Sequence, residues 1–268
     1  VLQSRGLGDV YKRQVVDVNN NPLNPIINTR SFSEDPGIVS EYAAQYIRGL
    51  QENGMISTAK HFPGHGDTQT DSHSSLAMIP SDSSRLWSVE LKPFIDVANA
   101  GVDAIMIAHV HAPDFQPESD IPATLSKFWV TDILKNKIGY KGIVITDGMG
   151  MGGVTKNYAD DYAIIEAVKA GCDVIIQNYD IVGSINAIED AVKNNEISIE
   201  QINSSALKML KMKENAGLHL NPFVDLDFMM KTIGIKEHRE ASDRISTEAI
   251  TLVRDEKNLL PLDVDIKD

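Results

Sequence analysis

Two short stretches of the sequence hold side chains that could transfer a proton or attack a carbon atom. The first, "DSH" at 71–73, places Asp71 two residues before His73. An aspartate beside a histidine can select the tautomer of the ring and raise its pKa, which suits proton transfer near neutral pH. The second, "GIVITD" at 142–147, ends an apolar run with Asp147. A nucleophilic carboxylate and a separate proton donor are what glycoside cleavage needs.

Other chemistry fits some of the same residues. His109 and His111 are two apart at the end of a predicted strand, so their rings could face one ion together with Asp147. That layout resembles metal-dependent amidohydrolases. Asp147 could instead cap a following helix, and the 71–73 stretch could be an ordinary polar surface loop. From the residues alone, these alternatives stay open.

Short apolar runs, alternating with longer amphipathic stretches, must position these side chains. The runs are rich in Val and Ile and are apolar nearly throughout, which predicts strands covered on both faces, as in a parallel sheet. The predicted strands are 15–19, 57–62, 103–110, 142–148 and 173–177. The predicted helices, from apolar residues at helical spacing, are 36–52, 88–100, 126–137, 160–170 and 181–194. This alternation predicts an α/β fold.

Two α/β architectures compete, an open doubly wound sheet and a (β/α)8 barrel. No glycine-rich phosphate-binding loop follows any predicted strand, which disfavours a nucleotide-binding sheet. Polar residues stand instead at the strand ends, including Asp17, Lys60, His61, His109 and Asp147. A barrel gathers its strand ends around one mouth, where active sites lie, so we favour a (β/α)8 TIM-type barrel, truncated at its N-terminal side.

The chain is expected to have three parts. Residues 1–14 show neither strand alternation nor a helical stripe, and we interpret them as a non-native or mistranslated segment. Residues 15–220 would form the partial catalytic barrel. Residues 221–268 would be a linker and the start of an α/β sandwich domain, with a helix, a strand and a turn within 238–262.

Composition narrows the possible partners. The 268-residue chain has a formal charge of −13, whereas binding to nucleic-acid phosphates needs a basic surface, so we expect no nucleic-acid partner. No apolar run approaches the roughly 18 residues of a membrane span, so none is expected. Cys172 is the only cysteine, so no intrachain disulfide can form and the cysteine content does not indicate an oxidising or a reducing compartment. Bacterial periplasm, extracellular space and cytoplasm all remain open.

Three separated motifs closely resemble glycoside hydrolase family 3, specifically its β-N-acetylglucosaminidase branch. They are "DVNNNPLNPIINTRSFSEDP" at 17–36, "KHFPGHGDTQTDSH" at 60–73 and "GIVITDGMGMGGV" at 142–154. The resemblance implies a (β/α)8 barrel, followed in longer members by an α/β sandwich, and a retaining double displacement. It implies that Asp147 is the nucleophile and His73 the general acid/base with Asp71 as its dyad partner.

The same resemblance assigns Arg30, Lys60 and His61 to binding of N-acetylglucosamine, although they could also form structural salt bridges. It implies an exo-β-N-acetylhexosaminidase acting on an N-acetylglucosamine-containing glycan or peptidoglycan fragment, and we expect a monomer without metal or cofactor. "DSH" favours this over β-glucosidases of the family, which take a glutamate from their second domain. A β-glucosidase, a phosphorolytic variant, a metal-dependent hydrolase and an inactive sugar-binding fragment stay as alternatives. One departure is "DGMGMGG" at 147–153, which is glycine-rich where larger residues are more usual.

Overall fold

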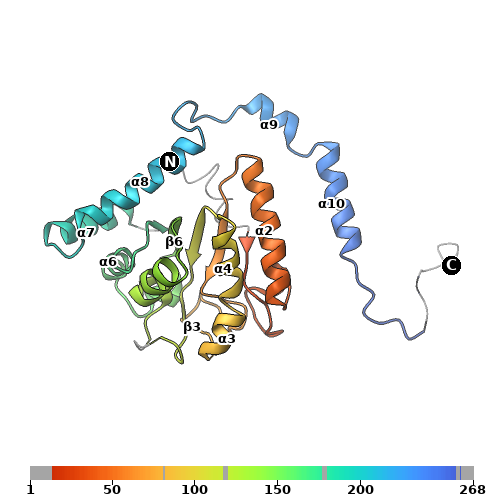
Figure 1. Cartoon of the computed structure of the whole chain (residues 1–268), viewed down its shortest axis with the longest axis horizontal. Helices are drawn as coiled ribbons and strands as arrows, with labels where there is room; N and C mark the ends of the chain where they lie inside the picture. Colours follow the sequence, from red (N-terminus) through yellow and green to blue (C-terminus); the bar gives the residue numbers. More distant parts are fainter. Residues whose placement is uncertain (1–13, 81, 117–119, 177–179, 258–259, 261–268) are drawn as a thin grey trace. The chain divides into compact units, whose positions relative to one another are not determined.

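A parallel β-sheet forms the centre of the first of the two compact units of the chain, Val1–Gly217 (Figure 1). The computed structural model describes residues 14–80, 82–116, 120–176, 180–257 and 260. The described strands of this sheet run in the order β1-β2-β4-β6-β7, and every neighbouring pair is parallel. They are β1 (Gln14–Val15), β2 (Thr58–Phe62), β4 (Ala104–Ile107), β6 (Ile143–Gly148) and β7 (Val174–Ile176). Their order in space follows the chain, as in the wall of a (β/α)8 barrel, so the predicted α/β class is confirmed.

Helical segments connect these strands or, in the case of α7 and α8, follow the last of them. The longer ones are α2 (Pro36–Glu52), α4 (Lys92–Asn99), the π-helix η3 (Phe128–Lys137), α6 (Asp160–Ala170), α7 (Ile181–Lys193) and α8 (Ile199–Asn215). The shorter ones are η1 (Asn28–Arg30), α3 (Ser83–Ser88), η2 (Ala123–Leu125) and α5 (Gly152–Thr155). The helices predicted at 36–52 and 160–170 are confirmed. Gly171 ends α6 in the left-handed region, with φ 114°, which favours glycine.

Local signals explain where α2 begins and which face it buries. The Asp35 carboxylate accepts hydrogen bonds from the N–H groups of Gly37 and Ile38, at 2.7 and 2.9 Å. Pro36 occupies the first helical position, where a missing N–H costs nothing. The apolar stripe then turns toward the sheet, with Val39, Ala43 and Ile47 all buried. Sequence spacing and packing therefore agree in this helix.

Three predicted elements of the first unit differ clearly from the structure, of which the strand predicted at 15–19 is the simplest case, since β1 ends at Val15. The helix predicted at 88–100 begins at Lys92 instead, because Pro93 favours a helix start, and α3 precedes it as a separate helix. The strand predicted at 103–110 splits into β4 and β5 (Val110–His111). β5 leaves the main sheet and pairs with β3 (Ala77–Met78) in a second, two-stranded parallel sheet. An apolar run alone does not reveal such a change of partner.

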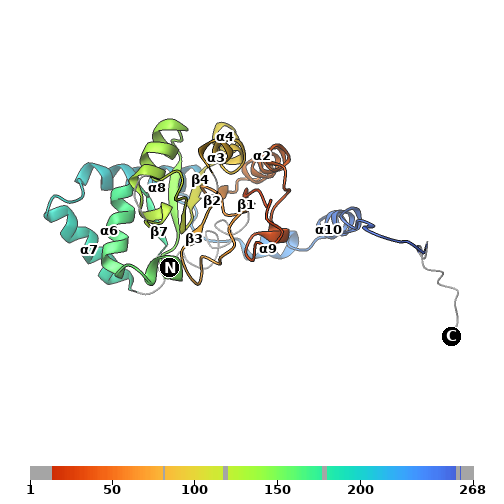
Figure 2. The ribbon, with the colours of Figure 1, turned by 90° about the horizontal axis from the view of Figure 1, so that it is seen from below.

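The core covers both faces of the sheet. On one face, Phe62 of β2 meets Phe94 of α4 and Trp129 of η3 edge to face, with centroids 5.4 and 6.0 Å apart. On the other face, Ile143 and Ile145 pack with Met209 and Met212 of α8. Helices α2 and α4 lie side by side, and α8 runs along the opposite side of the sheet (Figures 1 and 2). Coverage of both faces explains why the strands are apolar throughout.

The chain divides into two compact units, Val1–Gly217 and Leu218–Asp268. The second contains α9 (Leu226–Thr232) and α10 (Lys236–Glu248), and none of its described residues is buried. The strand predicted within 238–262 is absent from the described residues there, and the described residues of this unit offer no other strand for it to pair with. No described helix is long and apolar enough to span a membrane.

Some expectations concern residues outside those described, and one concerns the division into domains. The interpretation of residues 1–14 falls, apart from Gln14, on residues outside those described, as does Gln177 of the strand predicted at 173–177. The division into a catalytic barrel at 15–220 and a second domain from 221 stays a prediction.

Candidate active site

Polar side chains gather where the parallel strands end. Lys60 and His61 belong to β2, and Asp147 is the fifth residue of β6. His109 comes two residues after β4. The carboxylate of Asp147 is within electrostatic range of His61, His109 and Lys60. The shared edge of the sheet therefore brings together residues that lie far apart in the sequence.

Asp17, which follows β1, is the buried anchor of this edge. Its side chain is fully buried, and its carboxylate lies 2.7 Å from Nδ1 of His61. It also accepts hydrogen bonds from the backbone N–H groups of His61, at 3.2 Å, and His65, at 2.7 Å. Burial acts to raise the pKa of Asp17, but His61 and His65 hold it below its ordinary value. The carboxylate thus fixes both the ring of His61 and the start of the following loop.

The side chain of His65 forms hydrogen bonds with other residues of that loop. Nδ1 of its buried ring lies 2.5 Å from Oγ1 of Thr68, and Nε2 lies 2.9 Å from Oγ of Ser72. The amide of Asn24 adds hydrogen bonds to the backbone carbonyls of His65 and Thr68, at 2.7 and 3.0 Å. Burial, helped by the nearby His61, lowers the pKa of His65 to about 4. The ring is therefore neutral near pH 7 and acts as a structural crosslink.

Asp147 stands half-buried at the end of β6. One of its carboxylate oxygens accepts the backbone N–H of Gly148 at 2.8 Å. Burial acts to raise the pKa of Asp147, but His61, His109, this hydrogen bond and Lys60 together hold it below its ordinary value. Asp147 is therefore a carboxylate at neutral pH, as a nucleophile must be.

His109 packs beneath Asp147 with no exposed surface. Its Nε2 lies 2.9 Å from the carbonyl oxygen of Gly148, and its Nδ1 lies 2.8 Å from Oγ1 of Thr124. Because a carbonyl only accepts, Nε2 carries the proton in that contact. Burial lowers the pKa of His109, although Asp147 opposes that shift.

Asp71 and His73 form a pair on the exposed side of the loop. Nδ1 of His73 lies 2.7 Å from a carboxylate oxygen of Asp71, which also accepts the backbone N–H of His73 at 2.8 Å. Burial acts to raise the pKa of Asp71, but these two bonds from His73 lower it below its ordinary value. Asp71 therefore orients the ring with Nδ1–H inward, which leaves Nε2 to face other groups.

The predicted site residues are only partly assembled. Lys60, His61 and Asp147 are brought together, and the backbone of His73 is hydrogen-bonded to Gly152, five residues beyond Asp147. Within the described residues, no hydrogen bond or ion pair joins the side chains of His73 and Asp147. Arg30 is exposed, and its guanidinium donates to the carbonyl of Ile26 at 3.1 Å.

Three residues of this edge, Asp17, His65 and His109, were not among the predicted site residues. The sequence placed Asp17 and His109 at strand ends, and His109 was considered as a metal ligand, but neither was assigned to the catalytic or sugar-binding site. His65 gave no such signal, because a histidine within a polar loop more often faces solvent. All three are buried and hold other site residues in place, which spacing along the sequence does not reveal.

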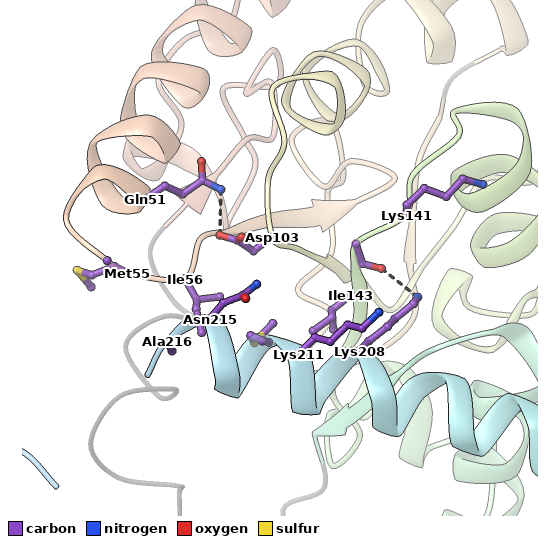
Figure 3. A pocket seen from close by; sticks show the side chains of 13 residues that line it. Gln51, Met55, Ile56, Asp103, Lys141, Ile143, Lys208, Lys211, Asn215 and Ala216 are labelled. Atoms are coloured by element: carbon purple, nitrogen blue, oxygen red, sulfur yellow. Dashed lines mark hydrogen bonds between the residues drawn. The ribbon is translucent and has the colours of Figure 1, made fainter. Parts of the chain in front are cut away.

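The described residues include no cluster of three or more His, Cys, Asp or Glu side chains suited to holding a metal ion. An opening with a volume of about 490 Å³ lies at the other end of the strands (Figure 3). Asp103, which precedes β4, accepts from Gln51 at 3.0 Å there, and Lys208 and Lys211 of α8 line the same wall. This opening does not contain the residues around Asp147.

Comparison with known proteins finds a matching family model and relatives that are similar over most of this chain. Residues 14–212 match the family model described as "Glycosyl hydrolase family 3 N terminal domain". Beta-hexosaminidase A of Pseudoalteromonas piscicida is 33% identical over an alignment of 280 residues, gaps included. The alignment covers 97% of this chain and 46% of that protein. A beta-hexosaminidase of Stenotrophomonas maltophilia is 39% identical over 175 residues, covering 65% of this chain and 50% of that one. The chain thus spans about half the length of these relatives.

Solved structures give the same architecture. A family 3 beta-N-acetylglucosaminidase from Paenibacillus sp. str. FPU-7 superposes with a TM-score of 0.83 at 36% identity, covering 90% of this chain and 46% of that one. A beta-glucoside phosphorylase superposes with a TM-score of 0.88 at 26% identity, covering 92% of this chain and 46% of that one. Both likenesses support assignment of the parallel sheet to a barrel-type N-terminal domain.

Proposed function

The chain belongs to glycosyl hydrolase family 3, and from this premise we propose that it carries the catalytic residues of a retaining exo-β-N-acetylhexosaminidase. The substrate would be a glycan or peptidoglycan fragment that ends in N-acetylglucosamine. The proposal assigns Asp147 as nucleophile, His73 as general acid/base and Asp71 as the residue that orients His73. Arg30, Lys60 and His61 would bind the terminal sugar.

The paired Asp71 and His73 carry this proposal. Their 2.7 Å contact holds one ring nitrogen, and 64% of the His73 side chain is exposed on a loop where a leaving group could reach it. The alternative donor in a glycosidase is a carboxylic acid, which would add a second negative charge near Asp147. A histidine avoids that repulsion once it has lost its proton.

In the first step, a carboxylate oxygen of Asp147 attacks the anomeric carbon while the glycosidic C–O bond breaks. His73, protonated on both ring nitrogens, gives the proton on Nε2 to the departing oxygen, and Asp71 stabilises the imidazolium. In the second step, neutral His73 takes a proton from water, which attacks the anomeric carbon and releases Asp147. Two inversions at one carbon retain its configuration.

The proposed sugar-binding role is better supported for Lys60 and His61 than for Arg30. Lys60 and His61 are buried beside Asp147, and Asp17 holds Nδ1 of His61, so that Nε2 of that ring is directed elsewhere. Both can therefore be donors at fixed positions near the anomeric carbon. Arg30 is exposed at η1, and its role requires that the guanidinium leave the carbonyl of Ile26 to reach a sugar.

A second candidate is a β-glucosidase or phosphorolytic activity. It is favoured by the superposition with a beta-glucoside phosphorylase and by a Cellulomonas fimi relative, 26% identical, whose name joins beta-N-acetylglucosaminidase with beta-glucosidase. Nitrophenyl N-acetylglucosaminide and nitrophenyl glucoside, each with and without inorganic phosphate, separate the candidates. Faster cleavage of the glucoside, or release of a sugar 1-phosphate, would overturn the assignment as a hydrolytic hexosaminidase.

Covalent trapping tests the nucleophile directly. A ring-fluorinated N-acetylglucosaminide with an activated leaving group should add one sugar to the chain, because fluorine slows hydrolysis of the intermediate more than its formation. Peptide mass spectrometry should find the sugar on Asp147, and Asp147→Ala should remain unlabelled. Asp103→Ala, which alters a carboxylate at the other end of β4, is the matched control. Labelling of any other carboxylate would refute the role of Asp147.

A further inference from the structure

Two glycines beyond Asp147 sit directly against the loop that carries Asp71 and His73. The N–H of Gly152 donates to the carbonyl of His73 at 2.9 Å, and the N–H of Gly153 donates to the carbonyl of Ser72 at 3.0 Å. These residues open the short helix α5, and first-turn N–H groups have no partner in their own helix. The loop therefore supplies the hydrogen bonds that α5 cannot.

Space at this contact admits no side chain. A Cβ atom added to Gly152 would lie 2.5 Å from the backbone oxygen of Ser74 and 2.8 Å from that of His73. A Cβ added to Gly153 would lie 2.9 Å from Cβ of His109 and 3.1 Å from the backbone oxygen of Ser72. Neither glycine has a left-handed φ, so close approach, rather than backbone conformation, calls for glycine here.

The two segments that meet here, the one after Asp147 and the loop that carries His73, are each also hydrogen-bonded to other parts of the fold. Met149 donates its N–H to the carbonyl of Ile176 in β7 at 2.9 Å, and the carbonyl of Gly148 accepts from His109. On the loop, the buried hydroxyl of Ser72 is held by His65 at 2.9 Å. The contact thus joins two segments that are each anchored elsewhere, while the side chain of His73 stays exposed.

We propose that Gly152 and Gly153 are positioning residues that dock the His73 loop against the segment after Asp147 and so set the reach of the acid/base. This inference rests on the proposed function. It gives a physical reason for the last two glycines of the "DGMGMGG" stretch, which let two backbones meet. Docking fixes the loop backbone beside the nucleophile and leaves the imidazole free to approach a leaving group.

Hydrogen exchange of the unaltered chain tests the contact without any substitution. The amide protons of Gly152 and Gly153 should exchange at least about 100-fold more slowly than in an unstructured peptide, because only the loop carbonyls protect them. Exchange of both amides at the unstructured rate would overturn the docking. This result does not depend on whether the chain has hexosaminidase activity.

Substitution then tests the link to catalysis. Gly152→Ala should raise exchange at Gly153 and slow cleavage of a natural disaccharide about 10- to 100-fold, because a displacement of about 1 Å at a catalytic group costs about that much. Labelling of Asp147 by the activated fluorinated sugar, which needs little acid assistance, should change less than threefold. Gly49→Ala is the matched control, since an added Cβ there meets nothing within 4 Å.

The possible failures can be told apart. If Gly152→Ala cleaves disaccharide and activated substrate in the same ratio as the unaltered chain, the positioning role is wrong. If the variant is unfolded by circular dichroism, Gly153→Ala, whose contacts are looser, gives the same comparison, and exchange of the unaltered chain still decides the docking. If the unaltered chain is not labelled at Asp147, the proposed function fails, while exchange still tests the contact.

Discussion

The candidate site combines buried side chains that hold the backbone with exposed side chains that are available to a substrate. Asp17, His65 and His109 belong to the first kind, and each contacts a backbone or hydroxyl group of a different segment. Asp71 and His73 belong to the second kind. Because buried polar groups are costly when unpaired, changes in the first kind should alter stability, whereas changes in the second should alter the rate of catalysis.

His65 should make the protein less stable as pH falls. Its pKa is about 4 in the folded chain, below the ordinary value of 6.5, so the unfolded chain binds more protons between these values. The contribution is complete above about pH 6.5 and is lost as the pH falls toward 4. The free energy of unfolding should fall by about 2–3 kcal/mol between pH 7 and 4.5 from this residue. Urea unfolding across that range measures it.

His65→Gln should flatten this pH dependence, and His219→Gln, which alters an exposed histidine, should leave it unchanged. The lowered pKa of His109 acts in the same direction, so some dependence remains in the His65 variant. Equal slopes for the two variants would show that His65 is not held neutral by the fold.

His73→Ala should affect substrates according to their leaving group. A natural disaccharide leaves as a poor alkoxide and needs a proton, so its rate should fall about 10²- to 10⁴-fold. A dinitrophenyl glycoside needs little assistance and should lose less than about tenfold. Steady-state rates with both substrates measure the difference, and Ser75→Ala on the same loop serves as control. Equal losses for both substrates would remove His73 from the proton-transfer role.

At the scale of elements, apolar periodicity predicted the bounds of regular helices. It did not predict strand boundaries that depend on which other strand is the pairing partner. Helix α2 has a proline start, an aspartate cap and one apolar stripe, so its bounds could be predicted. The 103–110 run is apolar throughout, and nothing in it marks the point where β5 leaves β4 to pair with β3. Similarly, Asp147 could be placed at a strand end, whereas the docking of Gly152 on the His73 loop depends on a fold-level contact.

Asp35→Ala should destabilise the first unit through α2. The carboxylate caps two N–H groups of a helix that buries four residues, and loss of such a cap costs about 0.5–2 kcal/mol. Asp225→Ala removes a similar cap, 3.0 Å from the N–H of Phe228, but α9 buries none of its residues. Urea unfolding should therefore show a shift for Asp35→Ala and none for Asp225→Ala. A larger shift for Asp225→Ala would contradict the assignment of α2 to the cooperative core.

At the scale of the whole molecule, the buried residues among those that the structure describes all belong to one unit. The sheet, its covering helices and all candidate site residues belong to Val1–Gly217. The described part of Leu218–Asp268 exposes large apolar side chains instead, among them Phe223 at 81% and Val253 at 91%. Apolar surface that stays in water contributes no stability, so the two units should differ sharply in their resistance to unfolding.

Removal of residues 218–268 should leave the first unit intact. No described side chain of that segment is buried, so the free energy of unfolding should change by less than about 0.5 kcal/mol, the range of ordinary surface changes. Protease treatment of the full chain should likewise cut first within 218–257, because exposed segments with few buried contacts open most easily. Urea unfolding of the shortened chain, followed by tryptophan fluorescence of Trp87 and Trp129, measures the first expectation. A loss above about 2 kcal/mol would mean that apolar side chains of the second unit are buried when the first unit folds in solution.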